Sequence, residues 1–412
     1  MLPSQVNVLI VGAGPAGATT SLFLEKKGID HLVIDKATFP RDKICGDALS
    51  GKVVDIVGKL DMNLLTEIET DADAFMPCYG ISFIAPNGKA LEIPFRTRVN
   101  DHVSAAGFIS KRVVFDNFLV NKLKPGRLLQ ACELVSFEKN EQGYNCQLRY
   151  NGGLHQVQTT MLVGAEGERS QVAKKLAGFK KDKNHYCAAV RGYYTGITGC
   201  KEGNYIELHF LKEVLPGYLW IFPLPDGQFN VGVGMASNKI SKNKVNLNKA
   251  LEEAISKVPA LAERFKNAKP ISPMLGWGLP LGSKKWPLSG EHFLLTGDSG
   301  SLIDPFTGEG IGNAMKMGML AANHIERSLQ AQKFDAAWNL QYDHAVYNDL
   351  WDELKIGRTL QWLTNFPWLF NFVVNKSLKN KTLRDTISCM FDDISMRDQM
   401  RSPMFYVRLL IN

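Results

Sequence analysis

The N-terminal segment carries glycines at a spacing that can bind the diphosphate of a nucleotide cofactor. An apolar run, residues 6–11, stops at Gly12, and Gly14 and Gly17 follow before a helix-like run that reaches Gly28. Gly12 permits a tight turn, Gly14 lets the backbone approach a pyrophosphate, and Gly17 lets the helix pack closely on the strand. The free N–H groups at the start of that helix would receive the phosphate charge. The spacing predicts a pyrophosphate site between a strand and a helix.

An acid follows the next strand at the distance that ribose recognition needs. A second apolar run, residues 32–34, ends in Asp35, whose carboxylate is placed to accept hydrogen bonds from a ribose diol. Strand, glycine turn, helix, strand and acid form the complete βαβ context. This unit does not distinguish NAD from FAD, because both carry an ADP moiety.

Two later segments repeat the pattern of a strand that ends in glycine and an acid. Residues 294–298 are an apolar run that ends at Asp298, and the glycine-rich stretch 299–312 then leads into a helix-like run. Residues 161–166 are an apolar run that ends at Glu166. A second helix N-terminus so far along the chain suits one long cofactor. The cofactor-binding domain is therefore expected to be interrupted by other material.

The interposed material is predicted to be β-rich. Short alternating runs at residues 205–210, 217–223 and 229–235 are separated by Gly, Pro and Asp turns, a pattern typical of antiparallel strands. One face of these strands is rich in aromatic residues, which fits either a pocket wall or a plain sheet core. After about residue 320 the pattern becomes helical.

Composition excludes several classes of protein. The chain has 412 residues, 45% hydrophobic and 22% charged, which is the balance of a globular protein with an apolar core. Its 48 basic and 41 acidic residues leave a net charge of +7, but the basic residues are dispersed and no nucleic-acid-binding motif accompanies them. The seven cysteines are odd in number and widely spaced, which predicts neither a disulfide framework nor a metal site. The sequence shows neither an export signal nor an apolar run long enough to span a membrane, so we expect a cytoplasmic protein. Contact with the inner face of the membrane stays an open alternative.

Six motifs in order carry a resemblance to a known class. They are the glycine segment with Asp35, residues 39–50 with Lys-x-Cys-Gly, residues 109–116 with Arg-x-x-Phe-Asp, residues 164–170, the Tyr-x-Trp-x-Phe-Pro segment 218–223, and residues 296–312. The chain resembles FAD-dependent oxidoreductases with the para-hydroxybenzoate hydroxylase-like fold, and within that class the geranylgeranyl reductase group. The Lys-x-Cys-Gly and Tyr-x-Trp-x-Phe-Pro segments indicate the group.

The resemblance implies an α/β fold with a discontinuous Rossmann-like FAD-binding domain, an interposed antiparallel β-sheet substrate domain and a C-terminal helical segment. We expect the FAD-binding domain at residues 1–75, 100–180 and 286–330. The substrate-binding domain is expected at residues 76–99 and 181–285, and the helical region at 331–412.

The resemblance also implies FAD as cofactor. The residues expected to bind it are Gly12, Gly14, Ala16, Gly17, Asp35, Lys36, Arg41, Cys45, Gly46, Ala48, Arg112, Glu166, Asp298, Gly308, Gly310, Ile311 and Gly312. Arg112 would reach the phosphate or ribityl region, with a surface arginine on an amphipathic helix as the alternative. The turn at residues 308–312 would present N–H groups to the N1 side of the flavin, where reduction places negative charge.

The electron donor is open among NADPH, ferredoxin and a separately reduced flavin. Glu166 stands where the family commonly has Asp. This difference leaves open whether the enzyme uses NADPH directly, and it leaves the role of Arg41 open as well.

By the same resemblance, Tyr218, Trp220 and Phe222 would border the substrate opposite the flavin. The expected reaction is hydride delivery to a carbon–carbon double bond of an isoprenoid or other apolar substrate, with Cys45 and Tyr218 as candidate proton donors. For Cys45 the alternative is backbone contact alone, with the thiol as an inert filler. Two other functions stay open: a monooxygenase that hydroxylates an aromatic or polyketide-like molecule, and a flavin-binding protein without enzymatic activity.

The segment 362–384 combines aromatic residues with lysines and an arginine. It is too short and interrupted to span a bilayer, but it could lie on a membrane surface and admit a lipid substrate. The alternative is a lid helix packed over the catalytic domain.

Overall fold

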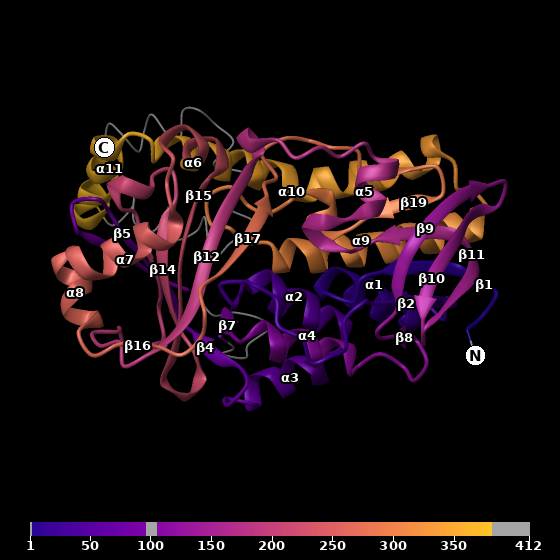
Figure 1. The fold of residues 1–412 in the computed structure, drawn as a ribbon, viewed down its shortest axis with the longest axis horizontal. Coiled ribbons are helices and arrows are strands. Elements are labelled where there is room, and N and C mark those ends of the chain that lie inside the picture. The colour runs from indigo at the N-terminus through magenta and orange to yellow at the C-terminus, as the bar shows by residue number, and fades with distance from the viewer. Residues whose placement is uncertain (1, 96–104, 381–412) are drawn as a thin grey trace.

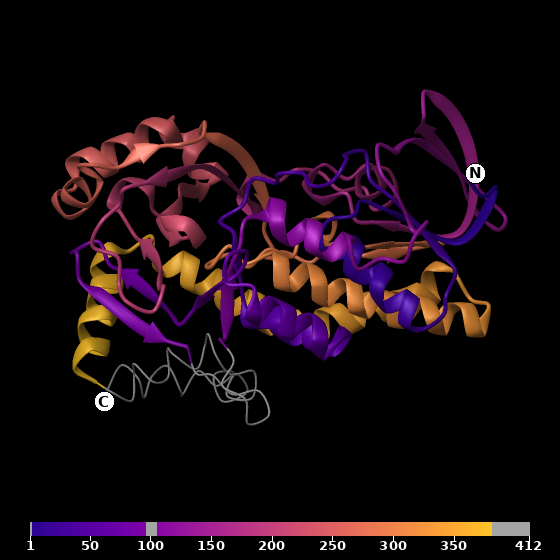
Figure 2. The same cartoon turned by 90° about the horizontal axis from the view of Figure 1, so that it is seen from below.

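The computed structural model describes residues 2–95 and 105–380 and builds them around two large sheets. Figures 1 and 2 show two lobes, one around each sheet, with long C-terminal helices running from one lobe toward the other.

The first sheet has the strand order β18-β19-β11-β1-β2-β8, and the strands from β19 to β8 are parallel. An antiparallel extension adds β10 to β11 and β9 to β10. The strands are β1 (Gln5–Val11), β2 (His31–Ile34), β8 (Leu128–Leu129), β9 (Glu133–Asn140), β10 (Gly143–Tyr150), β11 (Gly153–Gly164), β18 (Ser289–Gly290) and β19 (Phe293–Leu295). Helix α1 (Pro15–Lys26) connects β1 to β2, which confirms the predicted strand–helix–strand unit.

Alternating residues of β1 bury both faces of this sheet. Val8 and Ile10 pack with α1 and the C-terminal helices α9 and α10, whereas Leu9 and Val11 pack with residues of β9, β10 and the short helix α5. A strand that is apolar on both faces is typical of a parallel sheet covered on both sides. The carboxyl ends of the parallel strands are thereby left as the open edge of this lobe.

The second sheet has the order β16-β12-β15-β14-β13-β5-β6, with β17 paired to β12. The strands are β5 (Gly80–Ile84), β6 (Ala90–Pro94), β12 (Tyr186–Thr195), β13 (Ile206–His209), β14 (Tyr218–Pro223), β15 (Gln228–Ala236), β16 (Lys269–Pro270) and β17 (Leu275–Pro280). The three strands predicted from residues 205–235 are confirmed as β13, β14 and β15. All pairs are antiparallel except β13 with β5, which are parallel.

The two faces of the second sheet have different neighbours. Leu219 and Ile221 of β14 pack with Leu251 of α7 and Leu261 of α8, whereas Trp220 and the other even-numbered positions of β14 face the opposite side. That opposite side meets the first lobe and the C-terminal helices. The aromatic-rich face is therefore the inner face of the molecule.

A small third sheet and further helices complete the fold. The third sheet consists of β3 (Ala48–Leu49), β4 (Met76–Cys78) and β7 (Gly107–Ile109). The remaining helices are α2 (Gly51–Leu60), α3 (Met62–Thr70), α4 (Arg112–Val120), α5 (Gln171–Leu176), α6 (Ser237–Asn243), α7 (Leu247–Lys257), α8 (Pro259–Phe265), α9 (Ile311–Ala331), α10 (Ala336–Leu363) and α11 (Pro367–Lys379), with single 3₁₀ turns at Gly167–Arg169, Lys183–His185, Lys212–Val214, Pro225–Gly227 and Gly297–Gly300.

The domain boundaries stay a prediction. Residues 96–104 and 381–412, which belong to the predicted domains, lie outside the described residues. Within residues 2–95 and 105–380, no helix is long and apolar enough to cross a membrane. The six cysteines in this part of the chain are free thiols, and Cys389 lies outside it.

Candidate active site

A polar cavity of about 440 Å³ lies at the open edge of the first sheet. Its wall contains most residues that the sequence assigned to the cofactor: Gly12, Gly14, Ala16, Asp35, Lys36, Arg41, Cys45, Gly46, Arg112, Glu166, Asp298, Gly308, Gly310 and Ile311. They come from the ends of β1, β2 and β11, from the starts of α1, α4 and α9, and from the segments that contain residues 41–46, 298 and 308. Chain segments nearly 300 residues apart thus meet at one cavity.

The three glycines of the first turn have different physical roles. Gly12 has φ +102°, and a Cβ atom there would lie 2.4 Å from the carbonyl oxygen of Ala165. A Cβ on Gly17 would lie 1.8 Å from the carbonyl oxygen of Gly12, so Gly17 lets α1 pack on the turn without lining the cavity. Gly14 is the N-cap of α1, and a Cβ there would point into the cavity, 3.5 Å from Nη2 of Arg41. The backbone at Gly14 is open to a phosphate.

Asp35 is held rigidly at the end of β2. Its Oδ2 accepts a hydrogen bond from the backbone N–H of Ala13 at 2.8 Å, and its Oδ1 accepts one from Ala37 at 2.9 Å. The carboxylate therefore links the glycine turn to the strand that follows it, and it lines the cavity where a ribose would lie.

Arg112 and Arg41 share the carboxylate of Asp116. Arg112 donates from Nε at 2.6 Å and from Nη2 at 2.8 Å, and Arg41 donates from Nη1 at 3.0 Å. Only 7% of the Arg112 side chain is exposed, so the surface-arginine alternative is wrong. Two cations and one buried anion leave net positive charge on this wall, as a diphosphate requires.

Two buried polar atoms of the cavity wall test whether a cofactor fits. The indole Nε1 of Trp277 and the hydroxyl of Thr296 are buried, and neither has a hydrogen-bond partner among the described residues. Unpaired buried polar groups are costly, and a polar ligand in the cavity would satisfy both. These atoms, the open backbone at Gly14 and the positive wall fit a dinucleotide such as FAD.

Three predicted cofactor residues, Gly17, Ala48 and Gly312, do not line the polar cavity. Ala48 lines a second, apolar cavity instead. Gly312 faces away toward Glu309, where a Cβ would lie 2.3 Å from Oε1.

Glu166 lines the polar cavity, but its carboxylate caps helix α5. It accepts hydrogen bonds from the hydroxyl of Ser170 and from the backbone N–H of Gln171. Burial raises the pKa of Glu166.

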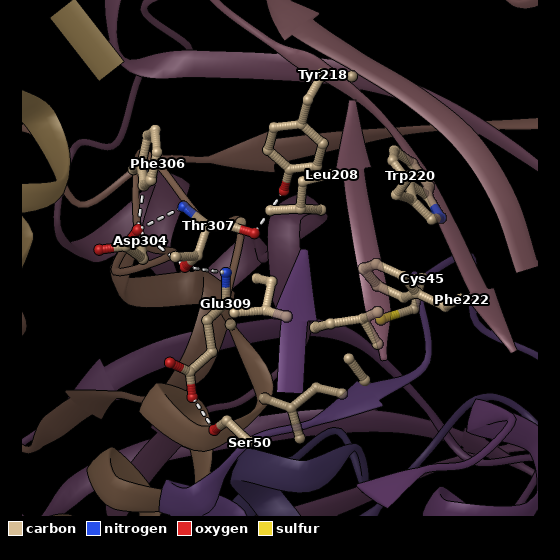
Figure 3. A pocket seen from close by; sticks show the side chains of 18 of the residues that line it. Cys45, Ser50, Leu208, Tyr218, Trp220, Phe222, Asp304, Phe306, Thr307 and Glu309 are labelled. Carbon is tan, nitrogen blue, oxygen red and sulfur yellow. Dashed lines mark hydrogen bonds between the residues drawn. The ribbon is translucent and has the colours of Figure 1, made fainter. Parts of the chain in front are cut away.

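The second cavity, of about 270 Å³, is apolar and lies against the inner face of the second sheet (Figure 3). Tyr218, Trp220 and Phe222 project into it from β14, Leu208 projects from β13, and Phe210 lines it directly after β13 ends. Gly232, opposite Trp220 in the register, makes room for the indole, because a Cβ at Gly232 would lie 2.2 Å from that ring. Of the two interpretations of the aromatic face, the pocket wall is confirmed.

The two cavities meet. Residues that line both are Cys45, Gly46, Ala189, Trp220, Leu279, Gly308, Gly310 and Ile311. Figure 3 shows Cys45 beside Phe222, across the hollow from the loop that carries Thr307 and Glu309. A ligand that fills the polar cavity would therefore face an apolar molecule at this junction.

The Tyr218 hydroxyl donates its proton to a hydrogen bond across the apolar cavity from Cys45. It donates to the carbonyl oxygen of Thr307 at 2.5 Å (Figure 3). Burial raises the pKa of Tyr218, which makes its proton harder to release.

Sequence reasoning missed two buried acids of the apolar cavity, Asp47 and Asp304. Asp304 accepts hydrogen bonds from the N–H groups of Phe306 and Thr307 and from the Thr307 hydroxyl, all through Oδ1. Asp47 follows Gly46 directly and is fully buried. Burial raises the pKa of each carboxyl to about 6. The Asp-Pro-x-Thr sequence could have signalled a turn at Asp304, whereas no local pattern marks Asp47.

The fold and the two joined cavities are those of an FAD-dependent oxidoreductase, and comparisons with known proteins agree. A family model described as "FAD binding domain" matches residues 5–64, and one described as "Geranylgeranyl reductase catalytic domain" matches residues 186–276. The chain is 30% identical over 389 residues to a menaquinone reductase of Mycobacterium tuberculosis, with 88% of this chain and 85% of the relative covered. It is 28% identical over 374 residues to a digeranylgeranylglycerophospholipid reductase of Methanococcus vannielii, with coverages of 88% and 89%.

The chain belongs to the geranylgeranyl reductase family of FAD-dependent oxidoreductases. Its fold is similar to that of a geranylgeranyl bacteriochlorophyll reductase-like protein of Thermoplasma acidophilum, with a TM-score of 0.76, 21% identity and coverages of 90% and 91%. A flavin-dependent brominase has a similar fold, with a TM-score of 0.74, 22% identity and 94% of each chain covered. Fold alone therefore does not select the reaction.

Proposed function

We propose that this enzyme reduces carbon–carbon double bonds of an isoprenoid lipid. The observation that carries the proposal is the apolar cavity that opens onto the polar one at Cys45 and Trp220. Its wall is built mainly of aliphatic and aromatic side chains, which suit a hydrocarbon chain. The relatives named as reductases of digeranylgeranylglycerophospholipid and of menaquinone support a prenyl substrate.

Reduced FAD supplies a hydride when it is bound. Reduction of a double bond also needs a proton on the second carbon, because the hydride brings two electrons and one hydrogen. The chain's own part is to hold the alkene at the junction, to exclude water with Trp220 and Phe222, and to deliver that proton. Cys45 is the candidate donor at the junction, since the Tyr218 hydroxyl is engaged with Thr307.

A single-turnover experiment tests the proposal without any assumption about the natural electron donor. The FAD-loaded protein is reduced with dithionite under anaerobic conditions and mixed with a geranylgeranyl lipid, which carries carbon–carbon double bonds but no quinone ring that the flavin could reduce instead. We expect flavin oxidation that depends on the lipid, with a product heavier by two hydrogen atoms per bond. The proposal is wrong if the lipid leaves the flavin reduced, or if aerobic turnover yields a product heavier by an oxygen atom after a transient absorption band.

We also infer that the corner between α10 and α11 contacts a lipid surface. Trp362, Phe366, Trp368 and Phe372 are exposed there, with Trp368 69% exposed. Gln361 and Thr364, at the same corner, line the apolar cavity. Apolar residues beside the cavity wall would give a membrane-dissolved chain a short path into the site.

Vesicle flotation tests this inference. The double variant Trp368→Ala with Phe372→Ala should lose most flotation with anionic vesicles, whereas Leu340→Ala, which removes a 49% exposed side chain elsewhere on α10, should float like the parent. Equal flotation of all three proteins, or none by the parent, would contradict the inference.

A further inference from the structure

One buried amide joins the loop that carries Cys45 to the wall of the apolar cavity. The Nδ2 of Asn230 donates to the carbonyl oxygen of Cys45 at 2.7 Å and to Oδ2 of Asp47 at 2.7 Å. Its Oδ1 accepts from the indole Nε1 of Trp220 at 2.8 Å. Asn230 is fully buried on β15, so three hydrogen bonds satisfy it without water.

Asp47 fixes the other end of the same loop. Besides Asn230, its Oδ2 accepts from the hydroxyl of Tyr193 at 2.8 Å, and its Oδ1 accepts from the backbone N–H of Arg112 at 3.2 Å. Its φ is +71°, a left-handed conformation that costs free energy for a residue with a side chain. The hydrogen bonds to three different elements offset that cost and hold the turn.

Arg191 secures the start of the loop. Its guanidinium is buried, donates from Nη2 to both carboxylate oxygens of Asp42 at 2.9 Å, and approaches the Cys45 carbonyl from Nε at 3.4 Å. The segment 42–47 is thus held to β12 and β15 of the second sheet at its start, its middle and its end.

We propose that Asn230 and Asp47 are positioning residues that hold Cys45 and Trp220 in one fixed relation at the junction of the two cavities. The amide is hydrogen-bonded to both the thiol-bearing loop and the indole. A shift of either side chain by about 1 Å would misplace the reacting groups and lower the rate by about a hundredfold. The effect on turnover rests on the proposed double-bond reduction, but the position of the thiol can be measured independently.

Alkylation of Cys45 reports that position directly. In the FAD-loaded protein, the rate of iodoacetamide modification is measured by mass spectrometry of each cysteine peptide, with the exposed Cys200 as internal reference. Asn230→Ala removes all three hydrogen bonds, so we expect about tenfold faster alkylation of Cys45 relative to Cys200. We expect kcat to fall by at least about tenfold while KM changes less.

Asn339→Ala is the matched control, because Asn339 is another fully buried amide with a full set of partners, distant from both cavity walls. It should lower the thermal midpoint about as much as Asn230→Ala, yet leave Cys45 alkylation unchanged. Equal alkylation of Cys45 in the two variants would overturn the proposal. If the parent reduces no lipid, the proposed function fails, and the alkylation result still decides the positioning role.

Asn230→Asp gives a second, pH-dependent readout. The new carboxylate keeps the acceptor for Trp220 but faces the Asp47 carboxylate and the Cys45 carbonyl. Tyr193 and Arg191 from β12 and the N–H of Arg112 from α4 also face this pair. At about pH 8 the two carboxylates repel each other, and at about pH 5.5 a shared proton restores a hydrogen bond between them.

We therefore expect Cys45 alkylation in Asn230→Asp, scaled to that of Cys200, to approach the parent value at the lower pH, while Asn230→Ala stays fast at both. If the ratio of the Cys45 alkylation rates in Asn230→Asp and Asn230→Ala does not change with pH, the contact with Asp47 does not have the proposed role.

Discussion

The two cavities touch at Cys45, yet they are built by opposite means. The polar cavity depends on backbone geometry: Gly12 and Gly14 open the turn, and the first residues of α4 and α9 line the same space. The apolar cavity depends on side chains from β13, β14, the loop at residues 304–309 and α10. The polar cavity is defined by glycines that lack a Cβ atom, and the apolar cavity is defined by the size of the aromatic rings in its wall.

This difference bears on how each region can change. A backbone site tolerates almost no substitution at its glycines, and in the polar cavity a few fixed side chains, among them Asp35, Arg41 and Arg112, add to it. A side-chain site can be reshaped one ring at a time.

The largest effect is expected from a side chain at Gly17. In Gly17→Val the new Cβ would lie 1.8 Å from the Gly12 carbonyl oxygen, so α1 must separate from the turn. We expect destabilisation by more than about 3 kcal/mol and a protein purified without flavin, measured by the ratio of visible to ultraviolet absorbance and by the thermal midpoint.

Gly14→Ala is the companion to that variant. Gly14 has φ −67°, so the backbone accepts Ala, and the methyl group would occupy only the space of the ligand. The thermal midpoint of the FAD-free protein should not change, whereas FAD affinity should fall by at least about tenfold. A yellow Gly17→Val protein with the parent midpoint would show that the turn is not the defining element of the polar cavity.

The next effect concerns the buried acid of the apolar region. The pKa of Asp304 is raised from 3.8 to about 6, so the folded state favours the protonated form. Stability from this group is full below about pH 3.8 and is lost as the pH rises through about 6, a change of roughly 3 kcal/mol. Asn at this position stays neutral.

We therefore expect Asp304→Asn to gain stability relative to the parent as the pH rises from about 4.5 to about 7, measured by thermal midpoints with excess FAD. Lys52 and Glu353 lie near enough to affect the charge of Asp304, so their variants are not suitable controls. A constant difference between the two proteins across this range would contradict the raised pKa.

The cavity itself is tested by filling it. Leu208 lies on β13 in the wall of the apolar cavity and does not line the polar one. Leu208→Trp should lower kcat/KM for the lipid by about thirtyfold, or roughly 2 kcal/mol, while the Kd for FAD stays the same. Leu208→Met conserves the volume and should behave like the parent. Weaker FAD binding in Leu208→Trp would mean that the two cavities are not separable.

The same contrast explains what the sequence could predict. The turn from Gly12 to Asp35 was predicted correctly because its interactions are local and each glycine has a steric reason. Asp47 and Asn230 were missed because their hydrogen bond joins residues 183 positions apart and leaves no periodic signal. Gly312 was expected at the flavin, but sequence proximity to Gly310 does not fix which side of the helix start a residue faces.

The smallest effect is expected from Tyr218, and it separates the two candidate proton donors. Tyr218→Phe removes one hydrogen bond to the Thr307 carbonyl and keeps the ring, which costs about 1 kcal/mol and less than about fivefold in kcat. A general acid that delivers the proton would instead lose at least about a hundredfold.

Cys45→Ala in the same assay gives the loss of kcat with which Tyr218→Phe is compared. Cys45 lies at the junction, whereas the Tyr218 hydroxyl donates its proton to Thr307 across the cavity. A large loss in Tyr218→Phe with a small one in Cys45→Ala would reverse the assignment. The aromatic wall, rather than the loop at residues 42–47, would then carry the chemistry, and the division between a backbone-built cofactor site and a side-chain-built substrate site would hold for binding but not for catalysis.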